Sequence, residues 1–102
     1  MNEKEQIINQ ILEALKSEPL KSAIKKAALF GSYLKGKEKS NSDVDILVEL
    51  NPEIRVGLFK FVAMERILSE RLGKKVDLLT YGALSRYFRD RVLKEAEVIY
   101  EK

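Results

Sequence analysis

The segment from Asp43 to Leu50 places two aspartates at the start of an apolar β-strand, a pattern that few folds accommodate. Every second side chain from Val44 onwards is apolar. Because successive side chains of a strand point to opposite faces, Asp43 and Asp45 share one face, with Cα atoms about 6.5 to 7 Å apart, and the apolar set faces a core. Neighbouring carboxylates repel each other, and a hard divalent cation such as Mg²⁺ relieves the repulsion. The segment therefore predicts a buried strand that presents a candidate metal site.

The alternative is a strand whose polar face is simply exposed to solvent. Aspartates on such a face keep the strand soluble or prevent it from pairing at a sheet edge. Aspartate is nevertheless depleted in strands, and positions where local sequence rules fail tend to be functional. Asp43 and Asp45 alone leave both interpretations open.

A glycine and a serine follow an earlier apolar run, Ala27–Phe30. Gly31 lets the backbone turn sharply and approach a ligand, since it has no side chain to block the approach. If Ser32 begins a helical turn, its hydroxyl and the free amides of that turn can donate to a phosphate oxygen. The pair is a candidate phosphate site, although a glycine turn with a capping serine has the same sequence.

A third aspartate, Asp77, lies between Val76 and Leu78 in another short apolar segment. It points away from its core-facing neighbours, as a residue on an exposed strand face also does. If the two strands are adjacent, the three carboxylates converge, and three acids can hold two cations about 3.5 to 4 Å apart. That geometry serves phosphoryl or nucleotidyl transfer.

The composition narrows the possible chemistry. Histidine and cysteine are both absent, which excludes zinc sites, thiol nucleophiles, disulfides and imidazole catalysis. The net charge of +3 could attract a triphosphate, a nucleic acid or an acidic partner, or could simply reflect a solvated exterior. With 102 residues and no apolar run of about 20 residues, we expect a single domain over residues 1–102 in the cytoplasm.

Periodicity predicts alternating helices and strands. We expect an α/β or α+β fold, in which a small mixed β-sheet is flanked by helices. Helices are expected at 4–16, 20–25, 56–72 and 83–96, and a single helical turn at 33–36. The apolar face of the helix at 56–72 is expected to hold Leu58, Phe61, Val62, Leu68 and Leu72, widened by Phe59, Met64 and Ile67, and Gly73 is expected as its αL cap. The helix at 83–96 is expected to have Leu84, Tyr87, Phe88, Arg91 and Val92 near one face. The strands are expected at 27–30, 43–50, 75–79 and 98–100, with a polar loop at 37–42.

The stretch Leu29-Phe30-Gly31-Ser32, ten residues, then Asp43-Val44-Asp45-Ile46-Leu47-Val48 closely resembles the signature of the DNA polymerase-beta-like nucleotidyltransferase superfamily. The short chain resembles its minimal nucleotidyltransferase branch. The helix at 56–72, the strand around Asp77 and the C-terminal segment also look like that branch, so the resemblance covers nearly the whole chain.

The resemblance implies roles for particular residues. Gly31 and Ser32 would hold the triphosphate of ATP, while Asp43, Asp45 and Asp77 would be catalytic and bind Mg²⁺, with two ions expected. Lys35 stands where many relatives have arginine and would add charge at the phosphates without a bidentate fork. A hydroxyl would attack the α-phosphate, and pyrophosphate would leave.

The acceptor is the remaining question. The minimal branch resembles antitoxins encoded beside a HEPN-domain ribonuclease toxin, which transfer AMP from ATP onto a tyrosine hydroxyl of that toxin. We expect this activity, in a hetero-oligomer with such a partner and away from membranes. One alternative is a non-catalytic subunit that neutralises or docks onto its partner by contact, through a basic helix with Arg86, Arg89 and Arg91. Another, with no recognition motif to support it, is transfer to a nucleic acid or a small molecule.

Overall fold

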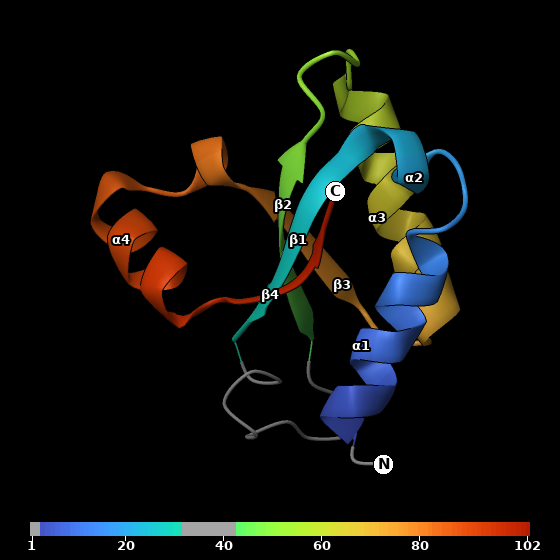
Figure 1. Cartoon of the computed structure of the whole chain (residues 1–102), viewed down its shortest axis with the longest axis horizontal. Helices are drawn as coiled ribbons and strands as arrows, with labels where there is room; N and C mark the ends of the chain where they lie inside the picture. The colour runs from blue at the N-terminus through green and yellow to red at the C-terminus, as the bar shows by residue number, and fades with distance from the viewer. Residues whose placement is uncertain (1–2, 32–42) are drawn as a thin grey trace.

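The protein folds as a mixed α/β structure. Figure 1 shows the computed structural model, which describes residues 3–31 and 43–102. Its elements are α1 (Glu3–Ala14), α2 (Leu20–Ala23), β1 (Ile24–Phe30), β2 (Val44–Leu50), α3 (Leu58–Leu72), β3 (Val76–Thr80), the 3₁₀ turn η1 (Tyr81–Ala83), α4 (Arg86–Glu95) and β4 (Glu97–Glu101). The fold class expected from the sequence is confirmed.

The four strands of the described residues form one mixed sheet in the order β3-β2-β1-β4. β1 runs antiparallel to both β2 and β4, whereas β2 and β3 are parallel. Parallel neighbours need a crossover connection, and α3 provides it between β2 and β3. β3 and β4 are therefore the edge strands, and β1 and β2 occupy the centre.

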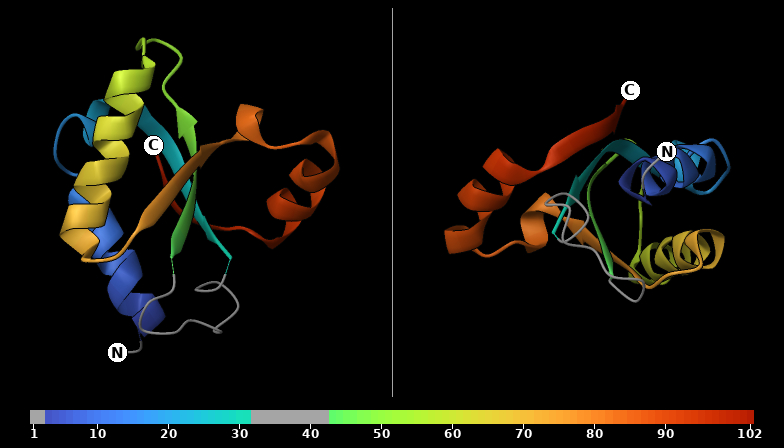
Figure 2. Two further views of the ribbon diagram at one scale, coloured as in Figure 1. Left: turned by 180° about the vertical axis from the view of Figure 1, so that it is seen from behind. Right: turned by 90° about the horizontal axis from the view of Figure 1, so that it is seen from below.

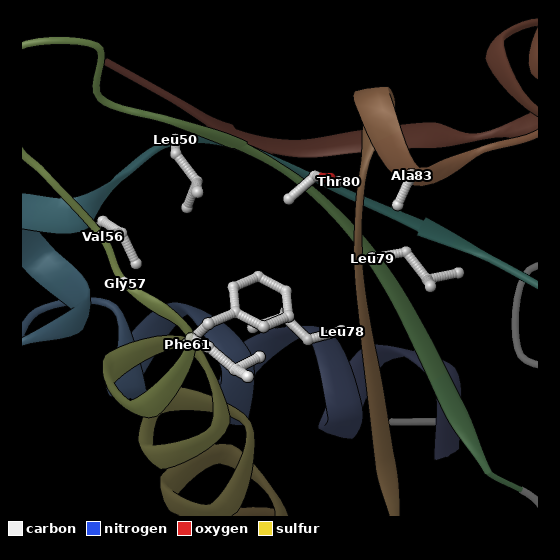
Figure 3. Close-up of a pocket in the computed structure, with 9 residues that line it drawn as sticks. Leu50, Val56, Gly57, Phe61, Leu78, Leu79, Thr80 and Ala83 are labelled. Atoms are coloured by element: carbon white, nitrogen blue, oxygen red, sulfur yellow. The ribbon is translucent and has the colours of Figure 1, made fainter.

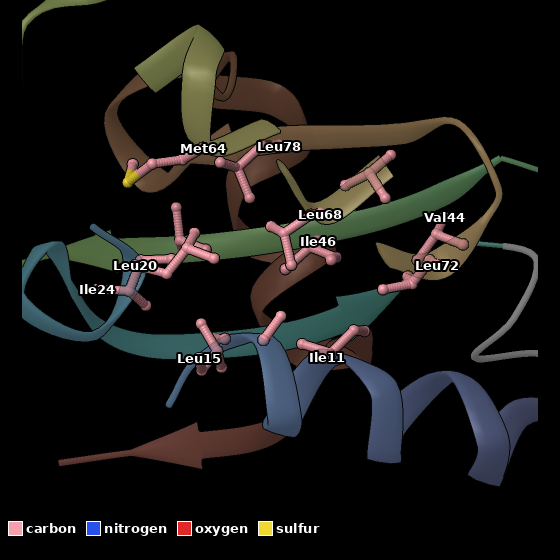
Figure 4. Packing of buried hydrophobic residues seen from close by; sticks show 14 of the residues in the cluster. Ile11, Leu15, Leu20, Ile24, Val44, Ile46, Met64, Leu68, Leu72 and Leu78 are labelled. Carbon is pink, nitrogen blue, oxygen red and sulfur yellow. The ribbon is translucent and has the colours of Figure 1, made fainter. Parts of the chain in front are cut away.

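Helices α1 and α3 cover one face of the sheet, and α4 lies on the other side (Figure 2). The hydrophobic core lies between the sheet and the two covering helices (Figure 4). Among the described residues, no helix is both long enough and apolar enough to cross a membrane. The buried members of this core are Ile7, Ile11, Ala14, Leu15, Leu20, Ala23, Ile24, Ala27, Leu29, Val44, Ile46, Val48, Met64, Leu68, Leu72, Val76 and Leu78.

The two central strands are also buried on the face opposite the core. Ala28 and Leu47 are paired across β1 and β2, and neither exposes any surface to solvent. Strands buried on both faces give continuous apolar runs rather than strict alternation, which explains the Ile-Leu-Val sequence of β2. Asp43 and Asp45 share the face of Leu47, so they border a dry patch of sheet.

The predicted apolar face of α3 is partly wrong. Met64, Leu68 and Leu72 are buried as expected, but Leu58 and Val62 are exposed, and Phe59 is 91% exposed. Val62 precedes Met64 by two residues, which at 3.6 residues per turn places it on the opposite side of the helix. The first turns of α3 therefore carry an apolar surface that the core does not use.

Several element boundaries also differ from the sequence expectation. β1 begins at Ile24, three residues early, because Ile24 pairs with Leu50 ahead of an irregularity in the register. α1 ends at Ala14 and α4 begins at Arg86, the latter because the preceding residues form η1. Gly73 is confirmed as an αL cap with φ of 66°. The helical turn predicted at 33–36 and the loop at 37–42 lie outside the described residues.

The described side chains of the predicted apolar face of α4 do not form part of the core either. Tyr87 is 93% exposed, Arg91 is exposed, and Leu84 and Val92 are only partly buried. The side chain of Phe88 lies outside what the structure describes. None of the α4 residues whose side chains are described is buried.

Replacing Ile11 by alanine tests the packing of α1 on the sheet. Ile11 is completely buried, so removing its methyl and methylene groups leaves a cavity and should cost about 2 to 5 kcal/mol of unfolding free energy. Urea denaturation measures this change. Gln10→Ala, at an exposed neighbouring position, should change the stability by no more than about 0.5 kcal/mol. Equal effects of the two substitutions would contradict the observed packing of α1.

Candidate functional site

Asp45 and Asp77 occupy adjacent positions on neighbouring strands. They are direct partners in the parallel register of β2 and β3, so their Cα atoms are separated by about one strand spacing of 4.8 Å. In-register residues of parallel strands point to the same face, here the face away from the core. β2 and β3 are therefore adjacent, which is the condition under which the sequence predicted that these carboxylates converge.

Gly31 lies directly against the carboxylate of Asp45. It follows Phe30, which pairs with Asp45 across β1 and β2, and it has a φ of 84°, in the region that favours glycine. A Cβ atom added to Gly31 would overlap Oδ2 of Asp45 and lie 3.1 Å from its Cγ. The glycine thus permits a close approach between the end of β1 and the acidic face of β2.

Asp43 stands just before β2 and is more exposed than Asp45. Its Oδ2 lies 3.9 Å from Nζ of Lys75, and both side chains are largely solvated, so the pair contributes little to stability. The backbone N–H of Val44 donates to the carbonyl of Lys75 at 2.9 Å, which extends the β2–β3 pairing to this end of the sheet. Sequence reasoning did not identify Lys75, although the Lys74-Lys75 pair directly before a strand with an acidic residue was a usable signal.

The site carries an excess of negative charge at Asp45. Burial raises the pKa of the Asp45 carboxyl above its usual range, and the neighbouring charges of Asp77 and Asp43 raise it further. Among the described residues, no lysine or arginine forms an ion pair with Asp45 or Asp77. A bound cation or proton would relieve this repulsion.

The donor set suits a hard cation, since carboxylate oxygens are the ligands that Mg²⁺ prefers. Within residues 3–31 and 43–102, no group of three acidic side chains is already close enough together to hold an ion. Asp43, whose Oδ2 lies 3.9 Å from Nζ of Lys75, is the most exposed of the three aspartates. The metal-binding roles of Asp43, Asp45 and Asp77 remain predictions.

The remaining predicted contacts concern the phosphates. Gly31 is in place at the end of β1, as described above. Ser32 and Lys35 lie outside the described residues. Their contact with a triphosphate stays a prediction.

An apolar cavity of about 400 Å³ opens elsewhere in the molecule (Figure 3). It lies between the last residues of β2 and β3 and the first turns of α3, whereas Asp45 and Asp77 lie at the beginning of the same strands. Its wall includes Leu50, Phe61 and Leu78, and none of the described residues that line it carries a charged side chain. Such an apolar lining does not suit a highly charged triphosphate, so the aspartate end of the sheet is the candidate site.

Sequence comparisons identify relatives along most of the chain. The family described as "Nucleotidyltransferase domain" matches residues 8–99. A proposed protein adenylyltransferase of Methanocaldococcus jannaschii is 40% identical over 89 residues, which is 87% of this chain and 94% of the relative. The protein adenylyltransferase MntA of Thermococcus cleftensis is 38% identical over 94 residues, 91% of each chain.

Solved structures show the same fold at lower identity. A toxin–antitoxin structure with AMP-PNP matches with a TM-score of 0.74 and 23% identity, covering 93% of this chain and 73% of that one. The complex of a tri-AMPylated Shewanella oneidensis HEPN toxin with an MNT antitoxin matches with a TM-score of 0.69 and 20% identity, covering 97% and 73%. The family match and the identity to the two sequence relatives extend over the strands that carry the aspartates, and from them we conclude that the chain belongs to the nucleotidyltransferase domain family and is a nucleotidyltransferase.

Proposed function

We propose that this protein transfers AMP from ATP to a tyrosine hydroxyl of a HEPN-type toxin and thereby acts as its antitoxin. The observation that carries the proposal is the in-register pair Asp45 and Asp77, with Gly31 against Asp45, on a sheet face that also holds Asp43. The names of the sequence relatives support adenylyl transfer, and the HEPN toxin complex among the structural matches supports the partner. Because the reaction consumes ATP, we place the protein in the cytoplasm.

The reaction joins a hydroxyl to the α-phosphorus of ATP. The acceptor oxygen forms the new bond while the bond from that phosphorus to the bridging oxygen of the β-phosphate breaks, so pyrophosphate leaves. Asp77 would accept the hydroxyl proton, and Gly31, Ser32 and Lys35 would bind the triphosphate. Asp43, Asp45 and Asp77 would hold Mg²⁺, which when bound supplies positive charge to the phosphates.

A second candidate is neutralisation of the partner by contact alone. The specific observation that favours it is α4, which leaves Tyr87 and part of Leu93 exposed beside Arg86, Arg89 and Arg91. Aromatic and arginine side chains are enriched at protein interfaces. The two candidates differ in whether the aspartates are needed.

Replacing Asp43 or Asp45 by asparagine should abolish AMP transfer. The protein is mixed with a HEPN partner, ATP and Mg²⁺, and mass spectrometry of the partner then detects added AMP groups. Glu49→Gln is the matched control, because Glu49 is an exposed acid on the same face of β2 and should leave transfer unchanged. Transfer that persists in both aspartate variants would refute the enzymatic assignment.

The same variants separate catalysis from contact. If AMP transfer is the means of neutralisation, Asp45→Asn should fail to protect cells from the toxin although it still binds the toxin. Growth assays and co-purification measure the two properties. Full protection by Asp45→Asn would instead support neutralisation by contact.

Replacing Gly31 by alanine should damage both the fold and the activity. The new Cβ would overlap the Asp45 carboxylate and would also force alanine into a φ of 84°. Gly73→Ala is the matched control, since Gly73 has a φ of 66° but open space around it. Both variants should lose about 1 kcal/mol of stability from backbone strain. Only Gly31→Ala should also lose most of its AMP transfer, and an equal loss in the control would show that the close approach is unimportant.

Asp45→Asn should stabilise the metal-free protein at neutral pH. Since the folded-state pKa of Asp45 lies above its unfolded value, its contribution to stability is present at low pH and is lost as the pH rises through the raised pKa. In EDTA at pH 7 the variant should be more stable than the wild type, and this gain should disappear below the ordinary aspartate pKa of about 3.9. Thermal denaturation against pH measures it, and Mg²⁺ should then raise the melting temperature of the wild type but not of the variant. A wild type more stable than the variant in EDTA at neutral pH would show that Asp45 is not repelled.

A further inference from the structure

Asp77 lies on an edge strand, where only one side is bonded to the sheet. Among residues 3–31 and 43–102, β3 pairs with β2 alone, so within this part of the chain the N–H groups that point outward from β3 have no strand partner. An exposed edge of this kind can pair with a strand of another molecule unless other groups cover it. Asp45, by contrast, lies on β2, which has strand neighbours on both sides.

Two side chains of α3 accept hydrogen bonds from this outer edge. The backbone N–H of Val76 donates to Oγ of Ser69 at 3.0 Å, and the N–H of Leu78 donates to Oε2 of Glu65 at 2.9 Å. Glu65 and Ser69 are four residues apart and so lie on the same side of α3. Their donors are the residues immediately before and after Asp77.

We propose that Glu65 and Ser69 are positioning residues for Asp77. By bonding the backbone on both sides of Asp77, they hold the edge strand against the helix and keep the Asp77 carboxylate in register with Asp45. The inference rests on the proposed function, because it takes Asp77 to be the third carboxylate of that site. Glu65 and Ser69 come from α3, which covers the core face of the sheet (Figure 2), whereas the side chain of Asp77 points to the opposite face.

The two bonds differ in strength and in ease of replacement. Glu65 is partly buried, and a carboxylate that accepts from an amide forms a stronger bond than a neutral acceptor does. Glutamine keeps an acceptor oxygen at that position, whereas methionine keeps the length of the side chain without a strong acceptor. At position 69, threonine keeps the hydroxyl and alanine removes it.

The test compares Glu65→Met, Ser69→Ala and their combination with the rescue variants Glu65→Gln and Ser69→Thr. The control is Glu70→Met, at an exposed position on the same helix. The first readout is amide hydrogen exchange at Val76 and Leu78, which should accelerate only where the acceptor is lost. The second is binding of Mn²⁺ to the protein without nucleotide, which needs no activity.

Loss of both acceptors should weaken Mn²⁺ binding by about tenfold or more, as is typical when the supports of a metal ligand are removed. The rescue variants should restore most of the affinity, and the control should match the wild type. In a protein that already carries Asp77→Asn, the double substitution at Glu65 and Ser69 should not lower the Mn²⁺ affinity any further. If Glu65→Met does not fold, Ser69→Ala and Ser69→Thr make the same comparison with a single bond.

Faster exchange at both amides with unchanged Mn²⁺ affinity would overturn the inference and leave these bonds a purely structural role. Normal AMP transfer by the double variant, with the wild-type dependence on Mn²⁺, would overturn it while the proposed function stands. Conversely, if Mn²⁺ binding depends on Glu65 but the wild type never transfers AMP, the proposed function fails and the positioning role stands.

Discussion

The parallel pairing of β2 with β3 is the constraint on which the other features of this molecule depend. It aligns Asp45 with Asp77, and like charges side by side on neighbouring strands oppose folding. The pairing also requires a crossover, and α3, which makes that crossover, contributes Met64, Leu68 and Leu72 to the core. The burial of α3 therefore offsets the electrostatic repulsion between Asp45 and Asp77, which the same crossover brings together.

The position of the acidic face follows from the burial of the central strands. Leu47 and its partner Ala28 are fully buried on the same face as Asp45, and the partial burial of Asp45 is the largest reason that its pKa is raised. Gly31 then fits against the same carboxylate, where a larger residue would overlap it. A partly buried carboxylate with two acidic neighbours costs stability in the free protein, and a bound positive charge would recover that cost.

Local sequence patterns predicted correctly those features that depend mainly on residues nearby in the chain. The alternation after Asp43 gave the strand and its faces, and Gly73 gave the end of α3. The faces of α3 and α4 were predicted less well because apolar residues occur around much of each helix. Periodicity alone could not reveal that Phe59 and Tyr87 point to solvent, since that depends on which elements pack against the helix.

The candidate site shows the same division. Gly31, Asp43 and Asp45 lie within or directly beside β1 and β2, so a short sequence motif reveals them. Asp77 could be added to the site once β2 and β3 were assumed to be adjacent. Glu65 and Ser69 leave no such pattern, because they bind backbone amides and any segment can supply an amide. A helix that carries a glutamate and a serine four residues apart is ordinary in sequence. Its importance arises only when the edge of β3, a few residues further along the chain, lies against it.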